Sequence, residues 1–148
     1  MSGPVVLTVH RDFADPPERV FDAWLDPKQA AHFLFATPDG EMLTCEIDPR
    51  VGGRGLVVER RPSGDARHRL QFETIDRPHR LVFLFAADPA PEGEWTRVAI
   101  HIAATPGGCT LTLTHEMDPQ WAAYEEQTRK GWTMILESLA RTLENGNG

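Results

Sequence analysis

The stretch that decides the fold, residues 118–143, reads DPQWAAYEEQTRKGWTMILESLARTL. Asp118 can accept hydrogen bonds from the first N–H groups of a helix, and Pro119 suits the first helical position because proline has no N–H to leave unpaired. Asn145 and Gly146 are typical of the left-handed stop that ends a helix. About 25 residues at 1.5 Å each would span roughly 37 Å, enough to cross a small domain. We therefore expect one long C-terminal helix around which the rest of the chain is organised.

The inner face of this predicted helix, centred on Trp132, changes character halfway along. Its first half carries Trp121, Glu125 and Thr128, and two of these are polar where a packed helix is normally apolar. Either these side chains border a ligand site, or they overhang solvent and Glu125 pairs with Arg129 one turn later, an interaction of only ~0.3–0.5 kcal/mol. The second half is apolar, which predicts packing in the core. It comprises Trp132, Ile135, Leu136, Leu139 and Leu143.

Composition points to an ordinary globular protein. With 148 residues, 41% of them hydrophobic and 25% charged, the chain can bury a core, and we expect one domain over residues 1–148. A net charge of −7 disfavours nucleic acid or an anionic membrane as the main partner. No apolar run approaches the ~20 residues of a membrane span and no signal sequence is evident, so we expect no membrane span and a cytoplasmic location. Cys45 and Cys109 are predicted to be small buried hydrophobes rather than a disulfide.

Seven segments of the remaining chain alternate between apolar and polar residues, as strands do. Two short helices are expected after the first strand. One is predicted to begin with Asp15 as its cap and Glu18 in the reciprocal position, and the other with Asp26 and Gln29, ending near Phe33. Short turns between the later strands predict hairpins, and therefore an α+β fold with one curved antiparallel sheet and its helices segregated. The predicted strands are residues 5–13, 42–47, 54–61, 68–76, 81–86, 96–104 and 109–115, with the longest loop at 88–93.

The order of these elements and several local strings resemble a known family. The strings are ADPPERVFDAW at residues 14–24, DPRVGG at 48–53, and LTHE at 113–116, followed by Gly131, Trp132 and Leu136. They are similar to the activator of Hsp90 ATPase-like family, within the START/SRPBCC (birch-pollen-allergen-like) superfamily of helix-grip folds. The resemblance spans essentially the whole chain and implies a seven-stranded sheet wrapped around the long helix, with a hydrophobic cavity between them. Function follows less directly, because this superfamily includes lipid carriers, cyclases, co-chaperone domains and many uncharacterised bacterial proteins.

The sequence contains no strong catalytic or cofactor motif. It has no HExxH, G-x-S-x-G, P-loop, CxxC or G-x-G-x-x-G pattern, so we expect no catalytic residue, metal or cofactor. Among the six histidines, His115 continues the apolar side of its strand and is expected to point inward. His68 and His79 lie among arginines near turns, which indicates a solvated basic rim. His32 lies beside two phenylalanines and is predicted to border the mouth of a cavity.

We therefore predict a cavity between the sheet and the C-terminal helix that binds a small hydrophobic or amphipathic molecule. Two alternatives stay open. A cyclase- or hydrolase-type enzyme would use His115 or Glu125 as acid or base, and a co-chaperone-like module would bind a chaperone through its surface. We expect a monomer or a homodimer. The candidates for the cavity wall are Phe33, Phe35, Phe72, Phe83, Phe85, Ile100, Leu113, His115, Trp121, Glu125, Thr128 and Trp132.

Overall fold

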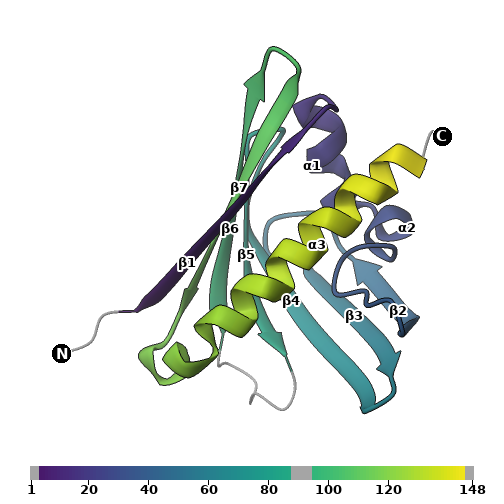
Figure 1. Ribbon diagram of the computed structural model, residues 1–148, viewed down its shortest axis with the longest axis vertical. Coiled ribbons are helices and arrows are strands. Elements are labelled where there is room, and N and C mark those ends of the chain that lie inside the picture. The colour runs from purple at the N-terminus through teal and green to yellow at the C-terminus, as the bar shows by residue number, and fades with distance from the viewer. Residues whose placement is uncertain (1–3, 88–94, 146–148) are drawn as a thin grey trace.

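Seven antiparallel strands form one sheet, and the first strand of the chain pairs with the last (Figure 1). The computed structural model describes residues 4–87 and 95–145 of the chain. The strand order in the sheet is β1-β7-β6-β5-β4-β3-β2, so every other pairing joins strands that follow each other in the sequence. The strands are β1 (Val5–Phe13), β2 (Glu41–Ile47), β3 (Arg54–Arg61), β4 (Gly64–Asp76), β5 (Arg80–Ala87), β6 (Thr96–Thr105) and β7 (Gly108–Met117).

The helices are segregated from the sheet, as the sequence predicts. They are α1 (Pro17–Leu25), α2 (Pro27–Ala30), the 3-10 helix η1 (Pro119–Tyr124) and α3 (Glu125–Asn145). Figure 1 shows α3 crossing one face of the sheet diagonally, with α1 and α2 beside its C-terminal part. Within the described residues, no helix is both long enough and apolar enough to cross a membrane.

The concave face of the sheet forms the floor of the core. Alternate residues of β7 are buried, and the same alternation runs through the neighbouring strands. In the register, His115 lies between Leu7 of β1 and Val98 of β6, which places it on this inner face. The prediction that His115 points inward is therefore confirmed. The buried residues of β7 are Cys109, Leu111, Leu113, His115 and Met117.

The apolar half of α3 packs onto this floor, as predicted. Each buried side chain of this size contributes roughly 2 kcal/mol through removal of apolar surface from water. Arginines hold the helix near both ends: an Nη of Arg129 donates to the Thr8 carbonyl at 2.9 Å, and an Nη of Arg19 donates to the Leu143 carbonyl. The orientation of α3 over the sheet is thus set by the packing of its apolar half and by these two arginine hydrogen bonds. The buried residues are Trp132, Ile135, Leu136, Leu139 and Leu143.

The predicted single C-terminal helix is wrong in its first turns, where the chain forms the 3-10 helix η1 before α3 begins. The cap itself is confirmed, because the Asp118 carboxylate accepts from Gln120 N–H at 3.1 Å. The Asp118 carbonyl then accepts from Trp121 N–H at 2.9 Å, which is the i→i+3 bond of a 3-10 turn. The predicted stop at residues 145–146 extends beyond the described residues, and so does the long loop at 88–93.

Three other boundaries also differ from prediction. Asp15 does not cap α1, because Pro16 takes that position and the Asp15 carboxylate accepts from Arg19 at 2.9 Å instead. Asp26 caps α2 as predicted, but the α-helix ends at Ala30. Strand β4 begins four residues early, at Gly64, whose φ of +123° permits a tight two-residue connection to β3.

Candidate functional site

A cavity of about 410 Å³ lies between strands β5, β6 and β7 and the η1–α3 segment. It falls within the 300–1,000 Å³ range of small-molecule sites and, like them, mixes aromatic walls with a few polar groups. We call it the aromatic cavity. Its lining residues are His68, Phe85, Ala86, Ala87, Thr96, His115, Met117, Trp121, Tyr124, Gln127 and Thr128.

A chain of hydrogen bonds fixes the imidazole of His115 in the cavity wall. Indole Nε1–H of Trp132 donates to Nδ1 at 2.9 Å, and this nitrogen must be the acceptor because an indole N–H can only donate. Nε2 of His115 lies 2.7 Å from the Thr96 hydroxyl, which itself donates to the Phe85 carbonyl at 3.1 Å. The only consistent direction has His115 Nε2–H donating to Thr96. His115 is therefore a neutral imidazole with both nitrogens engaged.

The surroundings of His115 reinforce this neutral state. The side chain is buried, with 2% of its surface exposed, and burial lowers the pKa of His115 to about 4 because a charged imidazole would lose its hydration. A histidine that is neutral at pH 7 and has both nitrogens in hydrogen bonds has no site left for a substrate proton. The predicted acid or base role of His115 thus has no support in this geometry.

The second imidazole in the wall belongs to His68, whose predicted position at the surface is wrong. It was expected on a solvated rim with His79, but its side chain is buried, and its Nδ1 lies 3.2 Å from the Val57 carbonyl. The Phe35 ring stacks on the imidazole at 4.1 Å between centroids and an interplanar angle of 3°. Phe35 also stacks on Phe85 at 5.0 Å. The result is an aromatic stack that backs one side of the aromatic cavity.

The backbone of Phe35 adopts the left-handed conformation, with φ of +57°. Such a conformation is unfavourable for a bulky residue, and strain of this kind tends to occur where the surrounding structure requires a particular side-chain position. A buried carboxylate holds the segment: Glu59 accepts from the Thr37 N–H at 2.7 Å and from the Thr37 hydroxyl at 2.9 Å. Arg61 pairs with Glu59 at 2.7 Å and donates to the Phe35 carbonyl at 3.2 Å. The Glu59–Arg61 pair thus fixes the Phe35 ring against His68.

The opposite wall comes from η1 and the first turns of α3. Side chains three residues apart are eclipsed in a 3-10 helix, so Trp121 and Tyr124 face the same way, with ring centroids 5.8 Å apart. One turn later, Gln127 and Thr128 complete this wall. Glu125 lies outside the cavity. Its carboxylate pairs with Arg129 at 3.3 Å and its side chain is 40% exposed, so the surface-pair interpretation is correct.

The structure brings together four of the predicted wall residues: Phe85, His115, Trp121 and Thr128. Seven others lie in the packed core beneath or beside the cavity: Phe33, Phe35, Phe72, Phe83, Ile100, Leu113 and Trp132. His32, predicted at the cavity mouth, is instead exposed and lines a different hollow. Sequence reasoning missed His68, although it precedes the buried Leu70 and Phe72 by two and four residues on one strand. Because alternate residues of a strand face the same side of the sheet, this spacing places His68 on the inner face.

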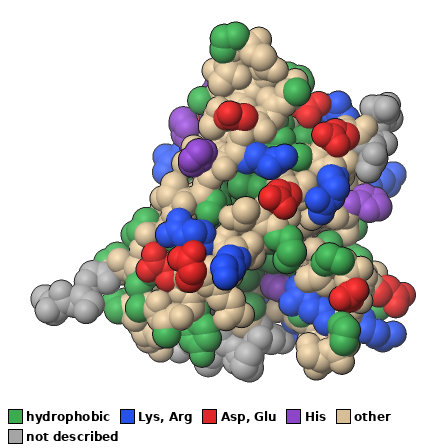
Figure 2. Space-filling model, in the orientation of Figure 1, with side chains coloured by type: hydrophobic (Ala, Val, Ile, Leu, Met, Phe, Trp, Pro, Cys, Tyr) green, Lys and Arg blue, Asp and Glu red, His purple; other side chains and the backbone are tan. Residues whose placement is uncertain are grey.

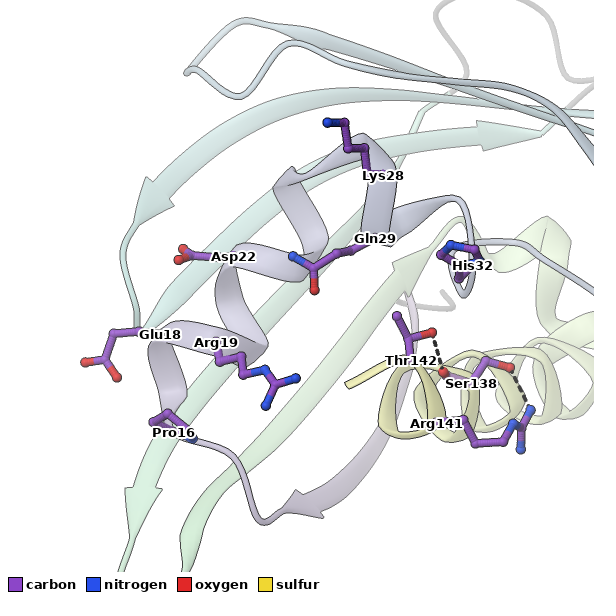
Figure 3. A pocket seen from close by; sticks show the side chains of 10 residues that line it. All are labelled: Pro16, Glu18, Arg19, Asp22, Lys28, Gln29, His32, Ser138, Arg141 and Thr142. Carbon is purple, nitrogen blue, oxygen red and sulfur yellow. Dashed lines mark hydrogen bonds between the residues drawn. The ribbon is translucent and has the colours of Figure 1, made fainter. Parts of the chain in front are cut away.

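The other hollow is larger, about 1050 Å³, and lies among α1, α2 and α3 (Figure 3). Arg19 points toward α3, whereas Glu18 and Lys28 extend away from it. Two of its charged groups have partners: Asp22 pairs with Arg77 at 2.7 Å, and Arg141 donates to the Ser138 hydroxyl at 3.0 Å. Acidic and basic side chains are intermingled over this whole face of the molecule (Figure 2). The described residues that line this hollow are largely charged and contain no aromatic ring other than that of His32, so it fits the composition of a small-molecule site less well than the aromatic cavity does.

Within the described part of the chain, no three His, Cys, Asp or Glu side chains converge closely enough to hold a metal ion. The two cysteines are free; Cys109 is buried as predicted, and Cys45 is half-buried. Burial raises the pKa of both thiols, so neither is a readily formed thiolate.

The chain matches the family model described as Activator of Hsp90 ATPase homolog 1-like protein over residues 14–144. The chain belongs to this family. The match confirms the resemblance seen in residues 14–24, 48–53 and 113–116 and at Gly131, Trp132 and Leu136, and the observed sheet and long helix confirm the SRPBCC-type fold that it implied. No curated protein matches the sequence of this family member.

Solved structures share the fold of this family member. Protein CV1439 from Chromobacterium violaceum is 27% identical, with a TM-score of 0.81 over 93% of this chain and 96% of that one. An AHSA1-like protein from Aeromonas hydrophila is 23% identical, with a TM-score of 0.80 over 95% and 92% of the two chains. A protein from Rhizobium leguminosarum is 20% identical, with a TM-score of 0.83 over 95% of each chain.

Proposed function

We propose that this protein binds a small apolar or amphipathic molecule in the aromatic cavity. The observation that carries the proposal is the cavity itself, a space of about 410 Å³ between sheet and helix in a fold whose remaining inner side chains form a packed core. A hollow of this size with aromatic walls is typical of a ligand site.

The construction of the walls supports this proposal. The Phe35 backbone is strained and is held in place by the buried Glu59 carboxylate and its part-buried partner Arg61, and the His115 imidazole is hydrogen-bonded through both of its nitrogens. Rigid walls favour ligand binding because little conformational entropy is lost when the ligand enters. The polar groups that Tyr124, Gln127 and Thr128 contribute to the lining are two hydroxyls and an amide, which can orient a ligand without requiring it to be charged.

Titration with the neutral fluorophore N-phenyl-1-naphthylamine tests the proposal. A Thr128→Phe variant places a ring in the cavity and should weaken binding about tenfold or more. A Thr133→Phe variant is the matched control, because Thr133 lies on the same helix but is exposed and outside the lining set, and it should bind like the wild type. Equal affinity of the wild type and Thr128→Phe, or no binding by any of the three, would overturn the proposal.

Membership of the family favours a second candidate, a co-chaperone-like interaction with an Hsp90 protein. Its support is the family description alone. Gel filtration of this protein with the Hsp90 of its own host at micromolar concentration tests it. A shared elution peak, unchanged by Thr128→Phe, would indicate binding through the surface rather than through the cavity, and separate elution would count against this candidate.

A further inference from the structure

We infer that the ligand of the aromatic cavity is an uncharged, flat aromatic molecule bearing a neutral hydrogen-bonding group such as an amide or a hydroxyl. This inference rests on the proposed function and specifies the chemical class that the cavity accepts. It depends on which side chains line the walls, on the direction of the His115 hydrogen bonds, and on where the nearby charges lie.

The lining offers aromatic surface and neutral polar groups. Of the described residues that border the cavity, none is an Asp, Glu, Lys or Arg. Aromatic rings enter from both sides, with Phe85 on the sheet and Trp121 and Tyr124 on the helical wall. Flat rings stack favourably at centroid separations of 4.5–7 Å, so a planar ligand matches these surfaces.

The His115 imidazole supplies no charge in the contacts that the structure shows. His115 accepts from Trp132 and donates toward Thr96, an arrangement that only the neutral ring can adopt. His68 presents one face to the Phe35 ring in a parallel stack and directs Nδ1 at the Val57 carbonyl.

Two charged neighbours of lining residues on the sheet, Glu116 and Arg97, face away from the cavity. Glu116, next to His115, is exposed on the other face of β7. Arg97, next to Thr96, pairs with Glu73 at 2.9 Å. On β6 and β7 a neutral side chain therefore faces the cavity beside a charge that faces solvent. On α3, Glu125 and Glu126 both pair with Arg129 at 3.3 and 3.6 Å.

This distribution discriminates against charged ligands. A carboxylate or ammonium moved into such a site loses hydration without gaining a counter-ion, and that penalty is much larger than for an amide or hydroxyl. Gln127 and Thr128 supply an amide and a hydroxyl that can hydrogen-bond to a neutral group. Selectivity should thus follow charge rather than shape.

Isothermal titration calorimetry at pH 8 with 2-naphthamide and 2-naphthoate tests the inference, since these probes differ in charge and hardly at all in shape. We expect the amide to bind at least about tenfold more tightly than the carboxylate, with (2-naphthyl)methylammonium as weak as the carboxylate. Equal or tighter binding of either ion would overturn the inference while leaving the proposed function intact. Failure of all three probes together with N-phenyl-1-naphthylamine would overturn both.

Charge-introducing variants show whether the discrimination arises in this cavity. Thr128→Lys should reverse the preference toward 2-naphthoate, whereas Thr133→Lys, on the exposed side of α3, should leave it unchanged. Thr128→Glu should favour (2-naphthyl)methylammonium and gives a second measurement if the lysine variant fails to fold. An unchanged preference in a folded Thr128 variant would overturn the inference, because the charge would then have been placed away from the ligand.

Discussion

At the scale of single residues, His115 lies in the wall of the aromatic cavity and connects α3 to the sheet. Its ring is held by Trp132 from α3 and by Thr96 from β6, so one imidazole joins the helix to the sheet. A buried polar group left unsatisfied would cost roughly 1–3 kcal/mol, and both ring nitrogens are satisfied here. His115 is therefore a structural wall residue, and its titration should be visible in the stability of the whole molecule.

The free energy of unfolding should fall as the pH drops below about 6.5, the pKa of an unperturbed histidine. The pKa of His115 is about 4 in the folded chain, against 6.5 for an unperturbed histidine, so the unfolded chain binds the extra proton first. Stability contributed by neutral His115 is complete above about pH 6.5 and is lost progressively between that value and about pH 4, by up to roughly 3 kcal/mol.

Urea unfolding at pH 7 and pH 4.5 measures this effect, with His115→Gln as the variant that cannot titrate. The wild type should lose more stability than the variant over this interval, because all other titrating groups are common to both. If both proteins show the same pH dependence, His115 is not the buried neutral group described above.

The burial of single residues could be predicted where the alternation of apolar and polar residues along one strand determined it. His115 follows Leu111 and Leu113 on the inner side of β7, so its direction could be read from the sequence. His68 obeys the same rule on β4, but the arginines around it suggested a solvated turn because the hairpin was placed too late. The buried role of Glu59 could not be predicted, since its partner Thr37 lies 22 residues away.

At the scale of elements, the junction between η1 and α3 decides which side chains reach the cavity. A wheel of 100° per residue aligns Trp121 with Glu125, but a 3-10 helix turns by about 120° per residue. The extra rotation brings Tyr124 into line with Trp121 and turns Glu125 toward Arg129. This difference in rotation explains why Glu125, predicted in the cavity wall, lies outside it.

The connection between α2 and β2 depends on another element-level contact, the buried Glu59 carboxylate. Glu59→Gln keeps the shape but removes the charge that pairs with Arg61, and breaking a buried pair should destabilise the fold by about 3 kcal/mol. Glu73→Gln is the matched control, because Glu73 pairs with Arg97 at the surface, where the loss should be below about 1 kcal/mol. Chemical denaturation of both variants makes the comparison, and equal losses would contradict this role of Glu59.

At the scale of the whole molecule, the fold was predictable because each level of the sequence indicated the same structure. Alternation defined seven strands, short turns made them antiparallel, and the apolar half of residues 118–143 identified the helix that covers the sheet. The cavity was predictable in its general position between sheet and helix. The residues that line it could not be predicted, because they depend on where the core packing ends. That boundary involves side chains from β4 to β7 and from the 3-10 helix η1 together.

A crystal structure of the protein with bound 2-naphthamide tests the central claim most directly, since it locates the ligand without relying on variants. We expect the naphthalene ring between Phe85 and Trp121 in the aromatic cavity, with its amide directed toward Gln127 and Thr128. A ligand found instead in the groove among α1, α2 and α3, with the aromatic cavity empty, would contradict the claim.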